Sequence, residues 1–132
     1  MGEVRSFRLL QRCDVLITNG IITAIAQGGG GDARETVDVA GLTILPGVVD
    51  AHIHLGHGMD IARPRQPEDA RSETAAAAIG GVTTFISYVM SSDPYLPVFD
   101  ELCQITEAGA RIDFGFHFVI ATEDHLVELP EL

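Results

Sequence analysis

Two histidines lie one residue apart in the stretch PGVVDAHIHL, residues 46–55, which is otherwise typical of a buried β-strand. Side chains of a strand alternate between its two faces, so Asp50, His52 and His54 are expected to share one face. Burying three such ionisable groups without partners is costly. Imidazole is a good zinc ligand. A bare His-x-His pair does not by itself indicate a metal site, but the strand context, Asp50 on the same face and the leading Pro46-Gly47 favour one. The alternative is a pair of core histidines satisfied by local hydrogen bonds.

The elements that position this stretch alternate between strand and helix. The expected order is a strand from Val48, a helix over 68–79, a strand over 82–89, a helix over 98–108, a strand over 111–120 and a helix beginning near Thr122. Such alternation predicts parallel strands joined by right-handed crossovers, as in a doubly wound sheet or a (β/α)₈ barrel. Active sites of both folds lie at the C-terminal ends of the strands, where the histidine pair falls.

The residues before Pro46 predict a small antiparallel β unit. Asn19-Gly20 separates two β-rich runs in DVLITNGIITAIAQ, residues 14–27, and this dipeptide is a strong hairpin signal. Residues 36–39 alternate like a further short strand, and the LTIL segment at 42–45 is expected to form another.

Composition narrows the classes of function. The chain has 132 residues and a net charge of −11, which argues against the clustered positive surface that nucleic-acid binding needs. It has no apolar window long enough to span a bilayer, so no membrane partner is expected. Cys13 and Cys103 lie far apart, which fits a reducing compartment and a cytoplasmic location.

Three segments carry a resemblance to a known family. LTILPGVVDAHIHL resembles the segment where enzymes of the amidohydrolase superfamily leave their small β-sandwich and enter the first barrel strand. AAAAIGGVTTFISYV looks like their second barrel strand with its preceding helix, and RIDFGFHFVI is similar to the third strand of the hydantoinase and dihydropyrimidinase branch. The resemblance implies an α/β fold: part of a β-sandwich over residues 1–46, followed over 47–132 by the start of a (β/α)₈ TIM-type barrel, about three βα units.

The resemblance also implies roles for individual residues. His52 and His54 match the pair that ligates the more buried metal of a binuclear zinc site. Asp50 matches the motif aspartate, which is expected to support the ligands without touching the metal. His117 matches a histidine of the third strand and is expected to be structural or to support the ligands in the same way. His57 and His125 are expected in solvent.

Departures from the family pattern bear on the substrate. Related dihydroorotases and allantoinases tend to follow the histidine pair with an arginine-containing loop that holds a substrate carboxylate. Here LGHGMD follows the pair and the first arginine is Arg63, which favours the hydantoinase-like branch. Tyr88 stands where hydantoinases often carry an aspartate, so the substrate stays open even within that branch.

Residues that the family's mechanism needs are missing from the chain. The family uses a carbamylated lysine on strand four, histidines on strands five and six and an aspartate on strand eight. This chain has three expected barrel strands and no lysine. We therefore expect the N-terminal part of a longer enzyme, with one pair of metal ligands and no catalytic residue within it. These 132 residues are expected to be inactive by themselves.

The function implied for the complete protein is metal-dependent hydrolysis of a ring amide C–N bond in hydantoins or dihydropyrimidines by a metal-activated hydroxide. Its partners would be a small cyclic amide and, in a homo-oligomer, further copies of itself. Two alternatives stay open: a non-catalytic scaffold or binding relative of the same fold, and another amidohydrolase such as dihydroorotase or allantoinase. Retention of His52 and His54 favours an enzyme.

Overall fold

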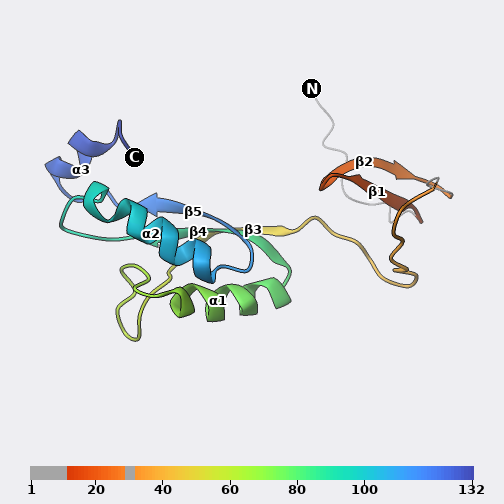
Figure 1. Cartoon of the computed structure of the whole chain (residues 1–132), viewed down its shortest axis with the longest axis horizontal. Helices are drawn as coiled ribbons and strands as arrows, with labels where there is room; N and C mark the ends of the chain where they lie inside the picture. The colour runs from red at the N-terminus through yellow and green to blue at the C-terminus, as the bar shows by residue number, and fades with distance from the viewer. Residues whose placement is uncertain (1–11, 29–31) are drawn as a thin grey trace, which may run out of the picture. The chain divides into compact units, whose positions relative to one another are not determined.

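The computed structural model describes residues 12–28 and 32–132 (Figure 1). The chain divides into two compact units, residues 1–45 and residues 46–132. Every helix in the described ranges is too short or too polar to traverse a lipid bilayer.

The first unit contains a β-hairpin made of β1 (Asp14–Thr18) and β2 (Ile21–Ala26), which pair antiparallel. Asn19 and Gly20 between them have φ of 52° and 77°. Both values lie in the left-handed region that a tight hairpin turn requires, which favours Asn and Gly at these positions. The predicted hairpin is therefore confirmed.

The two further strands expected in this unit, at 36–39 and 42–45, are wrong, because these residues are not in any strand. The segment instead forms a turn, in which the Leu42 N–H donates to the Val39 carbonyl. The Asp38 carboxylate accepts from the Ala40 N–H at 2.9 Å, and Gly41 has a φ of 81°. Local bonds of this kind compete with strand pairing, and an alternating pattern cannot make a strand without a partner.

The second unit is a parallel sheet with helices. Its strands β3 (Val48–Ile53), β4 (Val82–Val89) and β5 (Asp113–Phe118) lie in the order β3-β4-β5. Its helices are α1 (Pro67–Ile79), α2 (Leu96–Gly109) and α3 (Glu123–Glu128). The predicted strand–helix alternation is confirmed.

Sequential strand order places α1 and α2 on the same side of the sheet, because both crossovers step in the same direction with the same hand. Figure 1 shows these two helices side by side. A doubly wound sheet would place helices on both faces. The arrangement is consistent with the start of a (β/α)₈ barrel.

The core lies between the sheet and these helices. One buried cluster joins Leu55, Ala70 and Phe85. A second joins Val89, Tyr95 and Leu102. The side chains of Phe85, Ser87 and Val89 on β4 are buried in this core. Because side chains alternate along a strand, the residues between them, 86 and 88, face the opposite side of the sheet.

Candidate active site

The histidine pair lies at the C-terminal end of β3. His52 is in the strand, and His54 follows directly after its last residue. Their ring centroids are 5.5 Å apart, so both imidazoles lie on the same side, as the period-2 pattern predicts. His52 is exposed and His54 is half-buried.

Tyr88 joins the histidines from the neighbouring strand. Its ring centroid is 4.2 Å from that of His52 and 5.7 Å from that of His54. On its other side Tyr88 is paired in register with His117 of β5, and their rings meet edge to face with centroids 5.0 Å apart. The rings of four residues are thus in contact on this side of the sheet: His52, His54, Tyr88 and His117.

Sequence reasoning noticed Tyr88 only as a departure from a family pattern and did not place it beside the histidines. A signal was available, because Phe85, Ser87 and Val89 form the alternating set expected to pack in the core. Their even-numbered neighbour Tyr88 must then face the other way, at the level where β4 ends.

The segment after β3 is anchored from the core side. The backbone N–H of Leu55 donates to the Ser87 hydroxyl at 3.2 Å, and both residues are completely buried. This bond holds the chain immediately after His54 against β4. It thereby positions the His54 backbone at the end of the sheet.

The Nδ1 atom of His54 is buried and has no hydrogen-bond partner. A buried imidazole nitrogen without a partner is costly, and a metal ion is one group that would satisfy it. Within residues 12–28 and 32–132, however, no group of three or more His, Cys, Asp or Glu side chains is placed to hold an ion. The described residues at this site therefore offer an ion at most the two imidazoles of His52 and His54.

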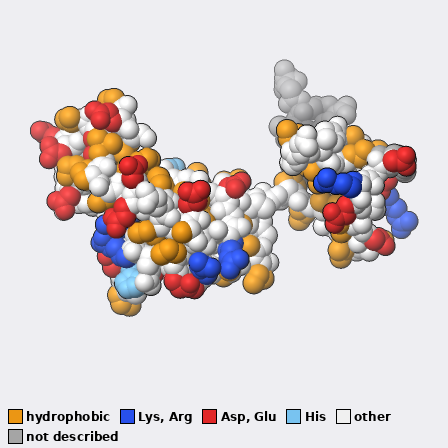
Figure 2. Space-filling view, in the orientation of Figure 1, with side chains coloured by type: hydrophobic (Ala, Val, Ile, Leu, Met, Phe, Trp, Pro, Cys, Tyr) orange, Lys and Arg blue, Asp and Glu red, His pale blue; other side chains and the backbone are white. Residues whose placement is uncertain are grey.

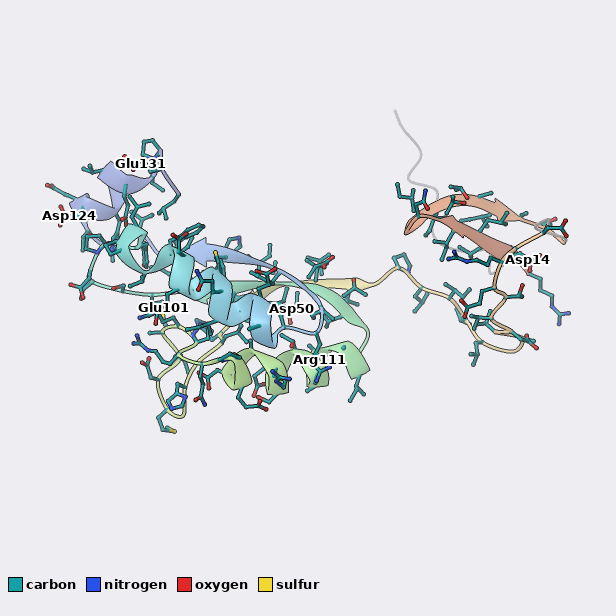
Figure 3. The ribbon with its side chains drawn as sticks, in the orientation of Figure 1. Asp14, Asp50, Glu101, Arg111, Asp124 and Glu131 are labelled. Carbon is teal, nitrogen blue, oxygen red and sulfur yellow. The ribbon has the colours of Figure 1, made fainter. Side chains whose placement is uncertain are left out.

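The Asp50 side chain is hydrogen-bonded to the backbone of its own strand, β3. Its carboxylate accepts from the His52 backbone N–H at 3.1 Å; Figure 3 labels Asp50 on β3. The pairing of β3 with β4 shifts between Asp50, which is opposite Phe85, and Ile53, which is opposite Ser87. Two residues of β3, 51 and 52, thus lie opposite one residue of β4, Ile86, and strict alternation does not extend through this bulge.

His57 is exposed, yet its ring is paired: Nδ1 lies 3.0 Å from the Asp69 carboxylate. The same carboxylate accepts from the backbone N–H groups of Arg65 and Gln66. Burial alone would raise the pKa of Asp69, but these hydrogen bonds and that of His57 outweigh it and lower the pKa. Asp69 therefore fastens the loop before α1 to the start of that helix.

The expectation that His125 lies in solvent is wrong, because its side chain is completely buried. Its Nδ1 accepts from the Ala121 N–H, and its Nε2 lies 3.0 Å from the Asp93 carbonyl oxygen. Its ring stacks on Tyr95 with centroids 4.5 Å apart. His125 thus joins the loop after β4 to the start of α3.

A pocket of about 150 Å³ lies beside the C-terminal end of β4 and includes Arg63 and Arg65 in its lining. Arg63 is paired with Glu101 of α2 at 3.3 Å, and Arg65 with Asp60 at 3.3 Å. Figure 3 labels Glu101 on α2. The first arginine after the histidine pair is thus already held by a carboxylate of the chain itself.

The chain is similar to several known enzymes. It is 32% identical to a D-hydantoinase of Geobacillus stearothermophilus over 99% of the chain and 28% of that enzyme. It is 35% identical to an allantoinase of Rubrobacter xylanophilus over 77% of the chain and 22% of the enzyme. It is 32% identical to a dihydropyrimidinase of Arabidopsis thaliana over 93% of the chain and 23% of the enzyme. No family model and no solved structure matches the chain, which spans about a quarter of the length of these relatives.

Proposed function

The chain belongs to the hydantoinase-like branch of the amidohydrolase superfamily, and on that basis we propose that the complete protein is a metal-dependent cyclic amidohydrolase. The reaction would break a ring amide C–N bond of a hydantoin or dihydropyrimidine. The observation that carries the proposal is the buried, unpartnered Nδ1 of His54, on the same side of the sheet as His52.

His52 and His54 would hold the metal, and zinc is an ion that suits a pair of imidazoles. When bound, the ion supplies a water of lowered pKa and polarises the ring carbonyl. Within the chain, Ser87 positions the backbone after His54 and Asp50 holds the backbone N–H of His52. We assign no proton acceptor to any described residue. The remaining ligands of a binuclear site would come from parts of the protein beyond this chain.

Substrate choice within the branch rests on the loop after the histidines. Arg63, the first arginine there, is paired with Glu101, which argues against its holding a substrate carboxylate in the way expected of dihydroorotases and allantoinases. We therefore propose a neutral cyclic amide. Allantoin is the second candidate, because an allantoinase is among the relatives at 35% identity.

We further propose a cytoplasmic location and a homo-oligomeric state for the complete protein. The location is supported by Cys13 and Cys103, both of which are free thiols in the structure. The oligomeric state is an expectation carried over from the family resemblance.

The test of the proposed function combines metal analysis with a substrate panel. The complete protein is purified, its bound metals are measured, and hydrolysis of hydantoin, dihydrouracil, allantoin and dihydroorotate is followed. We expect bound zinc and fastest turnover of hydantoin or dihydrouracil. Fastest turnover of dihydroorotate would contradict the substrate proposal. Absence of any turnover by the metal-loaded protein would favour a non-catalytic scaffold.

A further inference from the structure

We propose that Tyr88 is the positioning residue of the histidine pair, and that its ring orients the imidazoles in place of the usual hydrogen bonds. The inference rests on the proposed metal-binding role of His52 and His54. Tyr88 is not suggested as a ligand or as a group that transfers a proton.

The argument begins with how ligand histidines are normally held. A metal-ligating histidine usually donates its other ring nitrogen to a carboxylate, a carbonyl or water, which sets the orientation of the ring. In the part of the chain that the structure describes, no hydrogen bond reaches the ring of either histidine: His54 Nδ1 has no partner, and Asp50 bonds the backbone of His52 instead. Among the described residues, contacts between rings are therefore the interactions left to orient these imidazoles.

Tyr88 is in place to do so. Its ring is inclined 31° to His52 at a centroid separation of 4.2 Å, and 34° to His54 at 5.7 Å. Both ring pairs are tilted, and the separation of 5.7 Å lies within the range of favourable aromatic pairs, while the rings of Tyr88 and His52 are closer still. One side chain thus packs against both proposed ligands.

The position of Tyr88 is itself well defined. It belongs to β4, the central strand, whose neighbours in sequence Ser87 and Val89 are completely buried. On the side away from β3, the His117 ring meets Tyr88 edge to face with an interplanar angle of 78°. The Tyr88 ring therefore contacts residues on both neighbouring strands. His117 of β5 packs against one side of it, and the two histidines at the end of β3 pack against the other. This also gives His117 a role, which is to support Tyr88.

The ring, and not the hydroxyl, carries this role. No hydrogen bond joins the Tyr88 hydroxyl to any residue among 12–28 and 32–132, whereas the buried Tyr95 bonds through its hydroxyl to the carbonyl of Val119 at 2.7 Å. Phenylalanine at position 88 should therefore preserve the function of the side chain, and alanine should not.

The experiment compares Tyr88→Ala and Tyr88→Phe with wild type in the complete protein. The affinity for zinc is measured by competition with a chromophoric chelator, and the geometry of the site by the visible spectrum of the cobalt form. We expect Tyr88→Ala to weaken zinc binding about 10- to 100-fold, as when an orienting partner of a ligand histidine is lost. Tyr88→Phe should retain wild-type affinity and the wild-type cobalt spectrum.

Phe99→Ala provides the matched control. Phe99 is also a half-buried aromatic residue, but it lies on α2 and packs against Phe118 on the helical side of the sheet. Its loss should leave zinc affinity unchanged. Wild-type affinity in Tyr88→Ala, or an equal loss in Tyr88→Phe and Tyr88→Ala, would overturn the inference while leaving the proposed function intact.

A measurement without metal separates the two proposals. Histidine side chains are labelled with ¹³C, and the imidazole signals of His52 and His54 are recorded in the metal-free protein. We expect dispersed, sharp signals in wild type and Tyr88→Phe, and signals moved toward those of a free imidazole in Tyr88→Ala. If wild type binds no metal, the metal proposal fails, and unchanged signals in Tyr88→Ala would still refute the role of Tyr88.

Discussion

At the scale of single residues, the histidines of the second unit differ in what their ring nitrogens contact. Both ring nitrogens of His125 have backbone partners, and Nδ1 of His57 is paired with Asp69. The buried Nδ1 of His54 has none. Because an occupied nitrogen has to lose its partner before it can bind a ligand, the unpaired Nδ1 of His54 is available for an ion, whereas the rings of His57 and His125 are not.

His52→Ala and His54→Ala should each remove most of the bound metal and most of the hydrolytic activity of the complete protein. Each side chain would supply one of few ligands, so its loss leaves the ion weakly held. His57→Ala is the matched control, since it removes a ring that is already paired with Asp69. Metal content and initial rates are measured for all three variants. Full metal content in His52→Ala would contradict the proposed role of His52.

Glu128 predicts a pH dependence of stability. Its carboxylate accepts from the N–H groups of Tyr95 and Leu96 at 2.7 and 3.0 Å, at the start of α2. Burial alone would raise its pKa, but these two hydrogen bonds and nearby His125 outweigh it and lower the pKa below 4.5. A lowered folded-state pKa means that the contribution to stability is complete above the unfolded-state value and is lost as pH falls through the folded-state value.

Glu128→Gln removes the titrating group, but its amide keeps only one of the two oxygens that accept from Tyr95 and Leu96. The stability difference at neutral pH therefore includes a lost hydrogen bond, and the change of that difference with pH reports the charge. The free energy of unfolding of both proteins is measured in urea at neutral pH and at pH values below 4.5. Wild type should be the more stable at neutral pH, and the difference should shrink as pH falls. A difference independent of pH would show that the charge of Glu128 does not stabilise the fold.

At the scale of elements, α1 and α2 pack closely at one point. Gly109, the last residue of α2, faces the backbone at the start of α1. A Cβ atom at position 109 would overlap the carbonyl oxygen of Pro67 and lie 3.0 Å from the Cβ of Ala70. The absence of a Cβ atom at Gly109 therefore allows these two helices to approach this closely.

Gly109→Ala should lower the free energy of unfolding by about 1–3 kcal/mol, the usual cost of overpacking a close contact. Gly80→Ala is the control: Gly80 also ends a helix, with φ of −76°, and its nearest neighbour to an added Cβ is 3.3 Å away. It should change stability little. Urea denaturation of both variants tests this. Equal effects would indicate that the α1–α2 contact is not close enough to exclude a methyl group.

At the scale of the whole molecule, the surface of each unit can be considered separately. In the first unit, the hairpin exposes large apolar side chains, with Ile22 and Ile25 62% and 69% exposed. In the second, Figure 2 shows carboxylates distributed over the visible face. Strand β5 lies at the edge of its sheet, with β4 on one side of it. Exposed apolar patches and free strand edges both promote association between chains.

The chain of 132 residues by itself should therefore self-associate and should not hydrolyse hydantoin or dihydrouracil. We expect association because the isoleucines of the hairpin are exposed. We expect inactivity because the described residues offer an ion one pair of imidazoles and no third ligand beside them. Sedimentation velocity measures the first and a hydrolysis assay the second. The double variant Ile22→Thr, Ile25→Thr should be more monomeric. A monodisperse wild-type chain with turnover would contradict both expectations.

The sequence by itself determined the features that depend on local periodicity and backbone sterics. Alternation placed His52 and His54 on one side, and the Asn19-Gly20 dipeptide specified a hairpin turn with positive φ. Helix α1 ends at Ile79, directly before the glycine that predicted its end. Each of these depends on a few consecutive residues, so no knowledge of distant parts of the chain was needed.

Only the tertiary structure decided which residues meet across elements. The contact of Tyr88 with the histidines depends on the order of the strands. The bulge after Asp50, which interrupts strict alternation along β3, depends on the register of β3 with β4. The burial of His125 depends on where α3 packs, and residues 36–45 lack strands because no neighbour pairs with them. The physical reason is common to all four: burial and strand pairing are properties of two segments brought together, and a local pattern describes only one of them.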